Sequence, residues 1–179
     1  MDDFFGRLWR AAKLDKGLFK EVSLDEQASV QAYMAVACYS IALTLGAFGR
    51  TGIVGLNIGI LTTLFSWYVW AFFTYFFGAR IFKGPLGQVE RKGVFRALGF
   101  ACAPGLITAL GLLPGLAFIV MPSSVVWMVV AWVHATKVVF GYESAWRAVL
   151  VSLTAWVLAT IVQLSLFVLL FTVFGVSAS

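Results

Sequence analysis

Long apolar segments are the feature that most restricts what this chain can fold into. Five of them reach the length, about 20 residues, that an α-helix needs to cross the hydrocarbon core of a bilayer. They cover residues 29–48, 53–77, 94–113, 116–139 and 144–174. The chain is 61% hydrophobic and 12% charged, whereas soluble domains are about 25% charged. The sequence therefore predicts an all-α, polytopic membrane bundle of five transmembrane helices, with residues 1–28 as a cytoplasmic amphipathic segment and residues 29–179 as the transmembrane domain.

The fourth span has two candidate starts, and the fifth is longer than a bilayer requires. Pro122, Ser123 and Ser124 offer an alternative start for the fourth span, because proline disrupts helix interiors and serine caps helix starts. The fifth span would be about 45 Å long at 1.5 Å per residue. Because the hydrocarbon core is only about 30 Å thick, we expect this helix to tilt or to project at one end.

The basic residues indicate how the bundle is oriented. Twelve of the thirteen Lys and Arg residues fall on one alternating side of the spans: Arg7, Arg10, Lys13, Lys16, Lys20, Arg80, Lys83, Arg91, Lys92, Arg96, Lys137 and Arg147. The positive-inside rule places that side in the cytoplasm, so the N-terminus is expected inside and the C-terminus outside. Orientation also explains the net charge of +5, and nucleic acid is not expected as a partner.

The N-terminal segment has the pattern of an amphipathic interfacial helix. Its apolar residues recur at helical spacing, with basic residues towards the other side: Phe4, Phe5, Leu8, Trp9 and Ala12 against Arg7, Arg10 and Lys13. Such a helix lies in the headgroup layer with its apolar face in the acyl boundary, which makes phospholipids an expected partner. Packing of the same helix on the cytoplasmic loops of its own bundle is the alternative.

The third span is unusually rich in small residues and prolines for a membrane anchor. Gly99 and Gly105 offer surfaces on which a neighbouring backbone can pass closely. Pro104 removes one helical hydrogen bond, predicts a bend and frees a carbonyl near Phe100. Pro114 and Gly115 then predict a tight turn. The stretch is interpreted as helix packing, and a kink that lines a lipid or partner groove is the alternative.

Aromatic residues crowd the second half of the second span. Trp67, Trp70, Phe73 and Phe77 are among them, and they extend further than an interfacial belt requires. Contact with lipid or with the bundle itself is one interpretation. A surface for another membrane protein or a pigment is the other.

The sequence shows no constellation typical of catalysis or metal binding. His134 is the single histidine, and Cys38 and Cys102 lie within spans, where they are expected to be small buried residues. No Asp, Glu, Lys or Arg lies near the middle of a span, which argues against an ion-driven pump. We therefore expect no enzyme activity, no cofactor and no metal.

Two stretches resemble a known family. RLWRAAKLDKGLFKEVSLD is similar to the opening of bacterial members of the Yip family of Ypt- or Rab-interacting membrane proteins. FRALGFACAPGL resembles that family's LG-aromatic-x-x-x-P core, here Leu98, Gly99, Phe100 and Pro104. The resemblance implies a five-span membrane protein of the bacterial inner membrane that acts as a scaffold, organiser or trafficking factor. Rab binding is not implied, because only about 28 residues precede the first span and the bacterial branch has no prenylated Rab system.

Two classes of function follow. The first is a non-enzymatic membrane organiser or accessory subunit that associates with another integral membrane protein or with itself. The second is a small permease or lipid-handling protein that uses the kinked third span.

Overall fold

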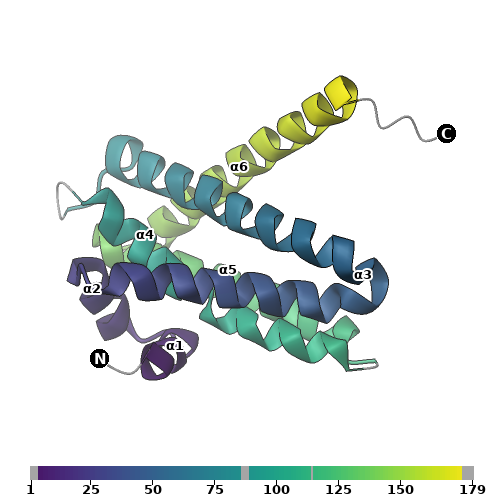
Figure 1. The fold of residues 1–179 in the computed structure, drawn as a ribbon. Coiled ribbons are helices and arrows are strands. Elements are labelled where there is room, and N and C mark those ends of the chain that lie inside the picture. The colour runs from purple at the N-terminus through teal and green to yellow at the C-terminus, as the bar shows by residue number, and fades with distance from the viewer. Residues whose placement is uncertain (1–3, 86–88, 114, 175–179) are drawn as a thin grey trace.

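The fold is entirely helical in the part of the chain that the computed structural model describes (Figure 1). The described residues are 4–85, 89–113 and 115–174, with side chains for all of them except 47–56, 167 and 170–174. The helices are α1 (Phe4–Ala12), α2 (Lys16–Leu24), α3 (Ala28–Phe76), the π-helical η1 (Phe77–Ile81), α4 (Arg91–Phe100), the 3₁₀-helical η2 (Ala103–Leu112), α5 (Ala117–Phe140) and α6 (Ala145–Phe174).

Within the described residues, five helical stretches are long and apolar enough to cross a membrane, as predicted. They are Ala28–Gly46, Asn57–Ile81, Arg91–Leu112, Ala117–Phe140 and Ala145–Leu166. The helix α5 begins at Ala117 and continues through Pro122, so the alternative start of the fourth span at that proline is wrong. Pro122 is the sixth residue of the helix, so its missing N–H removes one backbone hydrogen bond, the one to the Phe118 carbonyl, and the helix continues past this loss.

The helix α3 supplies two of the five spans because it folds back on itself (Figure 1). Thr44 and Gly59 would lie about 22 Å apart along a straight helix. In the structure, a Cβ atom added to Gly59 would lie 2.5 Å from Cγ2 of Thr44. We call Ala28–Gly46 the first limb of α3 and residues 57–76 its second limb. The two limbs therefore pack directly against each other.

The third span changes helix type where the sequence predicts a bend. The helix α4 ends at Phe100 and the 3₁₀ helix η2 begins at Ala103. The Cys102 N–H donates to the Gly99 carbonyl at 3.2 Å and the Gly105 N–H donates to the Cys102 carbonyl at 2.9 Å, both across three residues. Pro104 has no N–H with which to continue the α-helical pattern. After Pro104 the backbone therefore continues as a 3₁₀ helix, with about three residues per turn. The predicted bend within an α-helix does not form.

The third span runs through the centre of the bundle. In its most apolar window 78% of the residues are buried, against 17–39% in the other four spans. It packs on both limbs of α3 and on α5, while α2 lies beside its first half. A helix that is surrounded in this way needs small side chains where its neighbours cross it, because helices in lipid associate through close backbone contact.

Glycines at a spacing of six residues make these contacts: Gly93, Gly99, Gly105 and Gly111. A Cβ atom on Gly99 would lie 2.8 Å from the carbonyl oxygen of Ala32. One on Gly105 would overlap the ring of Tyr39, and one on Gly111 would lie 3.3 Å from the carbonyl oxygen of Gly46. Their partners on the first limb of α3 are seven residues apart, which is about two α-helical turns. The two spans therefore run side by side in the same direction.

We predict that Gly99→Ala destabilises the bundle by about 1–3 kcal/mol, because the new methyl group meets backbone atoms of α3 that cannot move aside. Gly111→Ala is the matched control, since its nearest contacts are 3.3–3.5 Å away and include the flexible Met121 side chain. Thermal unfolding in detergent measures both variants. Equal melting temperatures for the two variants would contradict the proposed contact.

Candidate functional site

The N-terminal segment is two helices, and the second is part of the core. Leu18, Phe19 and Val22 of α2 are completely buried, and α2 packs against α4 and α5. Leu14 separates the helices with a positive φ of 61°. The expected single interfacial helix is therefore broken after Ala12, because Asp15 starts a new helix by accepting a hydrogen bond from the Gly17 N–H at 2.8 Å.

The side of α1 that packs on the bundle is not the apolar side that the sequence pattern predicts. Leu8 and Ala11 are buried, but so is Arg7, which is only 7% exposed. Phe5 and Trp9 point outward at 74% and 64% exposure. The expectation that Arg7 lies on the outer, headgroup side is not met, because inward acceptors hold its guanidinium.

Those acceptors form an ion-pair cluster that fastens α1 to α2 and α3. Arg7 donates to Asp25 at 2.9 Å and to Gln31 at 3.0 Å, and it lies 3.2 Å from a Glu21 oxygen. Arg10 pairs with Glu21 at 2.9 Å and with Asp15 at 2.8 Å. These pairs join three helices in one network.

Two carboxylates of this cluster, Asp15 and Asp25, are stabilised in their ionised form. The hydrogen bond from Arg10 holds the pKa of Asp15 below its usual value. Burial works against ionisation of Asp25, but hydrogen bonds from Arg7 and from the Gln27 N–H still lower the pKa of that carboxyl. A lowered pKa means that the pairs contribute to stability above the ordinary value of 3.8. Their contribution is lost as the pH falls through the lower folded-state values.

The C-terminal end of α1 contacts the membrane-spanning helix α5. The Trp127 Nε1–H donates to the carbonyl of Ala12 at 3.0 Å. Trp127 is about 20 Å along α5 from the end of that helix at Phe140. Lys13 Nζ lies 4.8 Å from the centre of the Trp9 ring, so this lysine covers an aromatic face.

Arg96 holds α2 against α4 and is almost completely buried, at 2% exposure. Its Nε–H donates to the Val22 carbonyl at 3.0 Å and its Nη2 donates to the Ser23 carbonyl at 2.6 Å. These carbonyls belong to the last turn of α2, where intrahelical partners run out and a cation is favoured. From the sequence, Arg96 is predicted only as a charge that indicates orientation. Its place at the start of RALGF, directly before an apolar run, was the available signal.

Two of the tryptophans expected on a partner surface face the interior instead. Trp67 is 6% exposed, and its Nε1–H donates to the Leu98 carbonyl at 3.4 Å. Trp70 stacks on Trp132 with ring centres 3.8 Å apart. Phe73 and Phe77 are half-buried. The outward face of this limb carries other residues, Leu61, Phe65, Tyr68, Phe72 and Phe76. An apolar run does not distinguish these faces, because lipid and protein interior both accept aromatic rings.

Of the remaining sequence-predicted residues of the third span, two lie in the packed centre and one in the turn that follows. Phe100 is completely buried, and Gly105 lies between Tyr39 and Met128. Gly115 adopts a positive φ of 82° with open space around it, as a turn residue does. Pro114 lies outside the described residues.

A cavity of about 190 Å³ lies between both limbs of α3, Cys102 of the third span, α5 and α6. Its polar walls include Thr63, Thr160 and the Ser66–Gln163 pair, in which the Ser66 hydroxyl donates to Gln163 at 2.9 Å. The rest of the lining is largely aromatic and includes Trp67 and Trp70. The third span contributes Cys102 to this lining, and both cysteines are free thiols.

We predict that Arg96→Met destabilises the protein, because two carbonyls at the end of α2 lose a charged donor, at a cost of about 1.5–3 kcal/mol for each such hydrogen bond. Arg80→Met, at an exposed position of η1, is the control and should melt like the wild type. Melting temperatures in detergent, with limited proteolysis near residue 25, provide the readout. An Arg96→Met protein as stable and protease-resistant as the control would show that Arg96 does not fasten α2.

Comparisons with known proteins agree with this architecture. No curated protein and no solved structure matches the chain. The family model of the Yip1 domain matches residues 19–175, a range that begins within α2 and extends past the end of α6. With five helices able to cross a membrane and this match over most of its length, the chain belongs to the Yip1 domain family of multi-pass membrane proteins.

Proposed function

We propose that this protein is a non-enzymatic membrane scaffold or accessory subunit that associates laterally with another integral membrane protein or with a second copy of itself. Membership of the Yip1 domain family supports a role in membrane protein interaction. The proposed location is the bacterial inner membrane, with the N-terminus in the cytoplasm. The distribution of basic residues supports this orientation.

The outer half of α6 is the observation that carries the proposal. Figure 1 shows α6 crossing the bundle at an angle and its C-terminal half extending away from the other helices. Gln163 still bonds Ser66 on the second limb of α3. Beyond it, Leu164 and Val168 are 60% and 58% exposed. Membrane helices are stabilised by close packing against other helices. This half of α6 is therefore suited to pack against a helix of another protein or of a second copy of the chain.

We predict that a photo-crosslinking amino acid at Leu164 forms a specific adduct in intact cells. The mass of the adduct separates the two kinds of partner, since a homodimer has about twice the 19.6 kDa of the chain. The control is the same amino acid at Leu153, which lies on the inner half of α6 and is 51% exposed. Equal adducts at both positions, or none at either, would count against a partner at the outer half of α6.

A small permease or lipid-handling protein is the second candidate function. The cavity of about 190 Å³ supports it, because the cavity is lined by hydroxyl and amide groups within the spans and touches the third span at Cys102. Transport through the bundle would require water to reach these groups.

A single-cysteine panel tests the orientation and this alternative together, in a chain whose Cys38 and Cys102 are replaced with alanine. We expect Thr51→Cys to react with an impermeant maleimide in intact cells and Gly141→Cys to react only after lysis. Thr160→Cys, in the cavity wall, should stay unlabelled if the protein is a scaffold. Labelling of Thr160→Cys would favour the permease, and labelling of Gly141→Cys in intact cells would overturn the orientation.

A further inference from the structure

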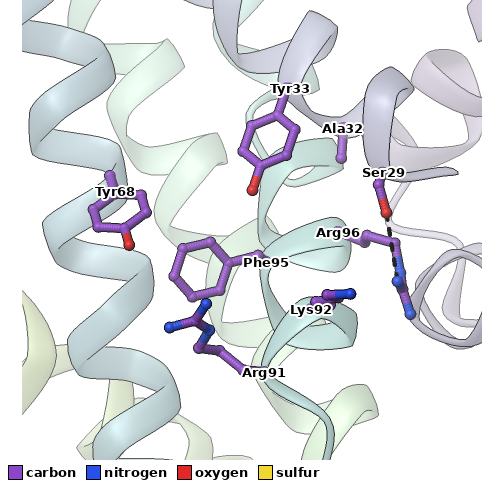
Figure 2. Close-up of a pocket in the computed structure, with 8 residues that line it drawn as sticks. All are labelled: Ser29, Ala32, Tyr33, Tyr68, Arg91, Lys92, Phe95 and Arg96. Atoms are coloured by element: carbon purple, nitrogen blue, oxygen red, sulfur yellow. Dashed lines mark hydrogen bonds between the residues drawn. The ribbon is translucent and has the colours of Figure 1, made fainter. Parts of the chain in front are cut away.

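A second cavity, of about 330 Å³, opens where α4 begins (Figure 2). We propose that it binds the phosphate headgroup of an anionic glycerophospholipid from the leaflet at this end of the bundle. Its walls come from the start of α3, the second limb of α3 and the first turns of α4. The residues that carry the argument are Tyr33, Tyr68, Arg91, Lys92, Phe95 and Arg96.

The charge of this cavity is positive. Three of its eight lining residues are basic, and none is acidic. Arg96 is occupied by the carbonyls of α2 and lies 3.5 Å from Glu90. Arg91 and Lys92 are exposed, and within the described part of the chain neither forms an ion pair. Two cationic side chains therefore remain available to a phosphate, and Arg96 adds a third positive charge to the lining.

The guanidinium of Arg91 is already held at the cavity. Its central carbon lies 5.9 Å from the centre of the Phe95 ring, a cation–π arrangement. Figure 2 shows Arg91 folded back beneath Phe95 on the side of Tyr68, while the Tyr33 hydroxyl points towards the same ring. Phe95 is fixed in turn by edge-on contacts with Trp67 and Tyr68, at 5.8 Å and 5.4 Å between ring centres. Less side-chain entropy is lost on binding when the cation is held in this way.

The position of the cavity favours a lipid over a soluble anion. Arg91 is the first residue of the third span, so the cavity lies at the level where headgroups meet the bundle. Tyr33 and Tyr68 are half-exposed at its rim. Two turns further along the same helix faces, Ile41 and Leu61 are exposed at 44% and 68%. A phosphate in the cavity would therefore have apolar surface beside it for the attached acyl chains.

The test uses the full chain purified in detergent and native mass spectrometry with added phosphatidylglycerol or phosphatidylcholine of identical acyl chains. We expect the wild type to retain phosphatidylglycerol in preference to phosphatidylcholine. The double variant Arg91→Gln/Lys92→Gln should bind phosphatidylglycerol roughly tenfold more weakly, or worse. The matched control Arg80→Gln/Lys83→Gln removes the same charge from exposed positions outside this cavity and should bind like the wild type.

Each other outcome overturns the proposal. Equal loss in both double variants would show diffuse attraction to a basic surface rather than a site. Equal retention of the two lipids by the wild type would exclude recognition of a net negative headgroup. Displacement of phosphatidylglycerol by millimolar inorganic phosphate would assign the cavity to a soluble anion. Melting temperatures of both double variants, expected to match the wild type because all four side chains are exposed, separate loss of binding from loss of fold.

Discussion

A span that is surrounded by other helices must let their backbones approach closely. The third span of this protein does so along its whole length. Glycines spaced six residues apart let the backbones of Ala32 and Gly46 approach, and the 3₁₀ helix after Phe100 has a smaller radius than an α-helix. In lipid, apolar side chains gain little from mutual burial, so such backbone contact is the main source of helix association. The folded-back α3 and α5 take their positions from this central span.

Buried arginines make the N-terminal helices part of the same structure. Arg96 holds the end of α2 through its carbonyls, and Arg7 holds α1 through Asp25 and Gln31. A buried guanidinium is costly unless nearly all of its donors have partners, so these contacts also specify where α2 and α1 can dock. The match to the Yip1 domain begins at residue 19, within α2. This agrees with α2 being a structural element of the domain rather than a peripheral anchor.

The two ends of the bundle offer different chemistry. At the end where α4 begins, basic residues, tyrosines and the cavity at Arg91 suit contact with lipid headgroups. At the other end, the outer half of α6 extends away from the bundle with apolar side chains exposed. A scaffold with these features would contact its surrounding lipid at one end and a protein neighbour at the other. The proposed lateral association and the proposed lipid site are independent, since neither shares residues with the other.

The sequence by itself determined the membrane class and the stretch that carries the family resemblance. It also determined the five spans, and most of their ends are correct to within a few residues, because span length and hydrophobicity are local properties. It also singled out Gly99 and Gly105. Only the tertiary structure decided that Trp67 and Trp70 face inward, that Arg7 is buried, and that Pro104 begins a 3₁₀ helix instead of bending an α-helix. In a soluble protein, polarity separates the buried face of a helix from its exposed face. In a bilayer both faces are apolar, so the inward direction depends on which helices become neighbours.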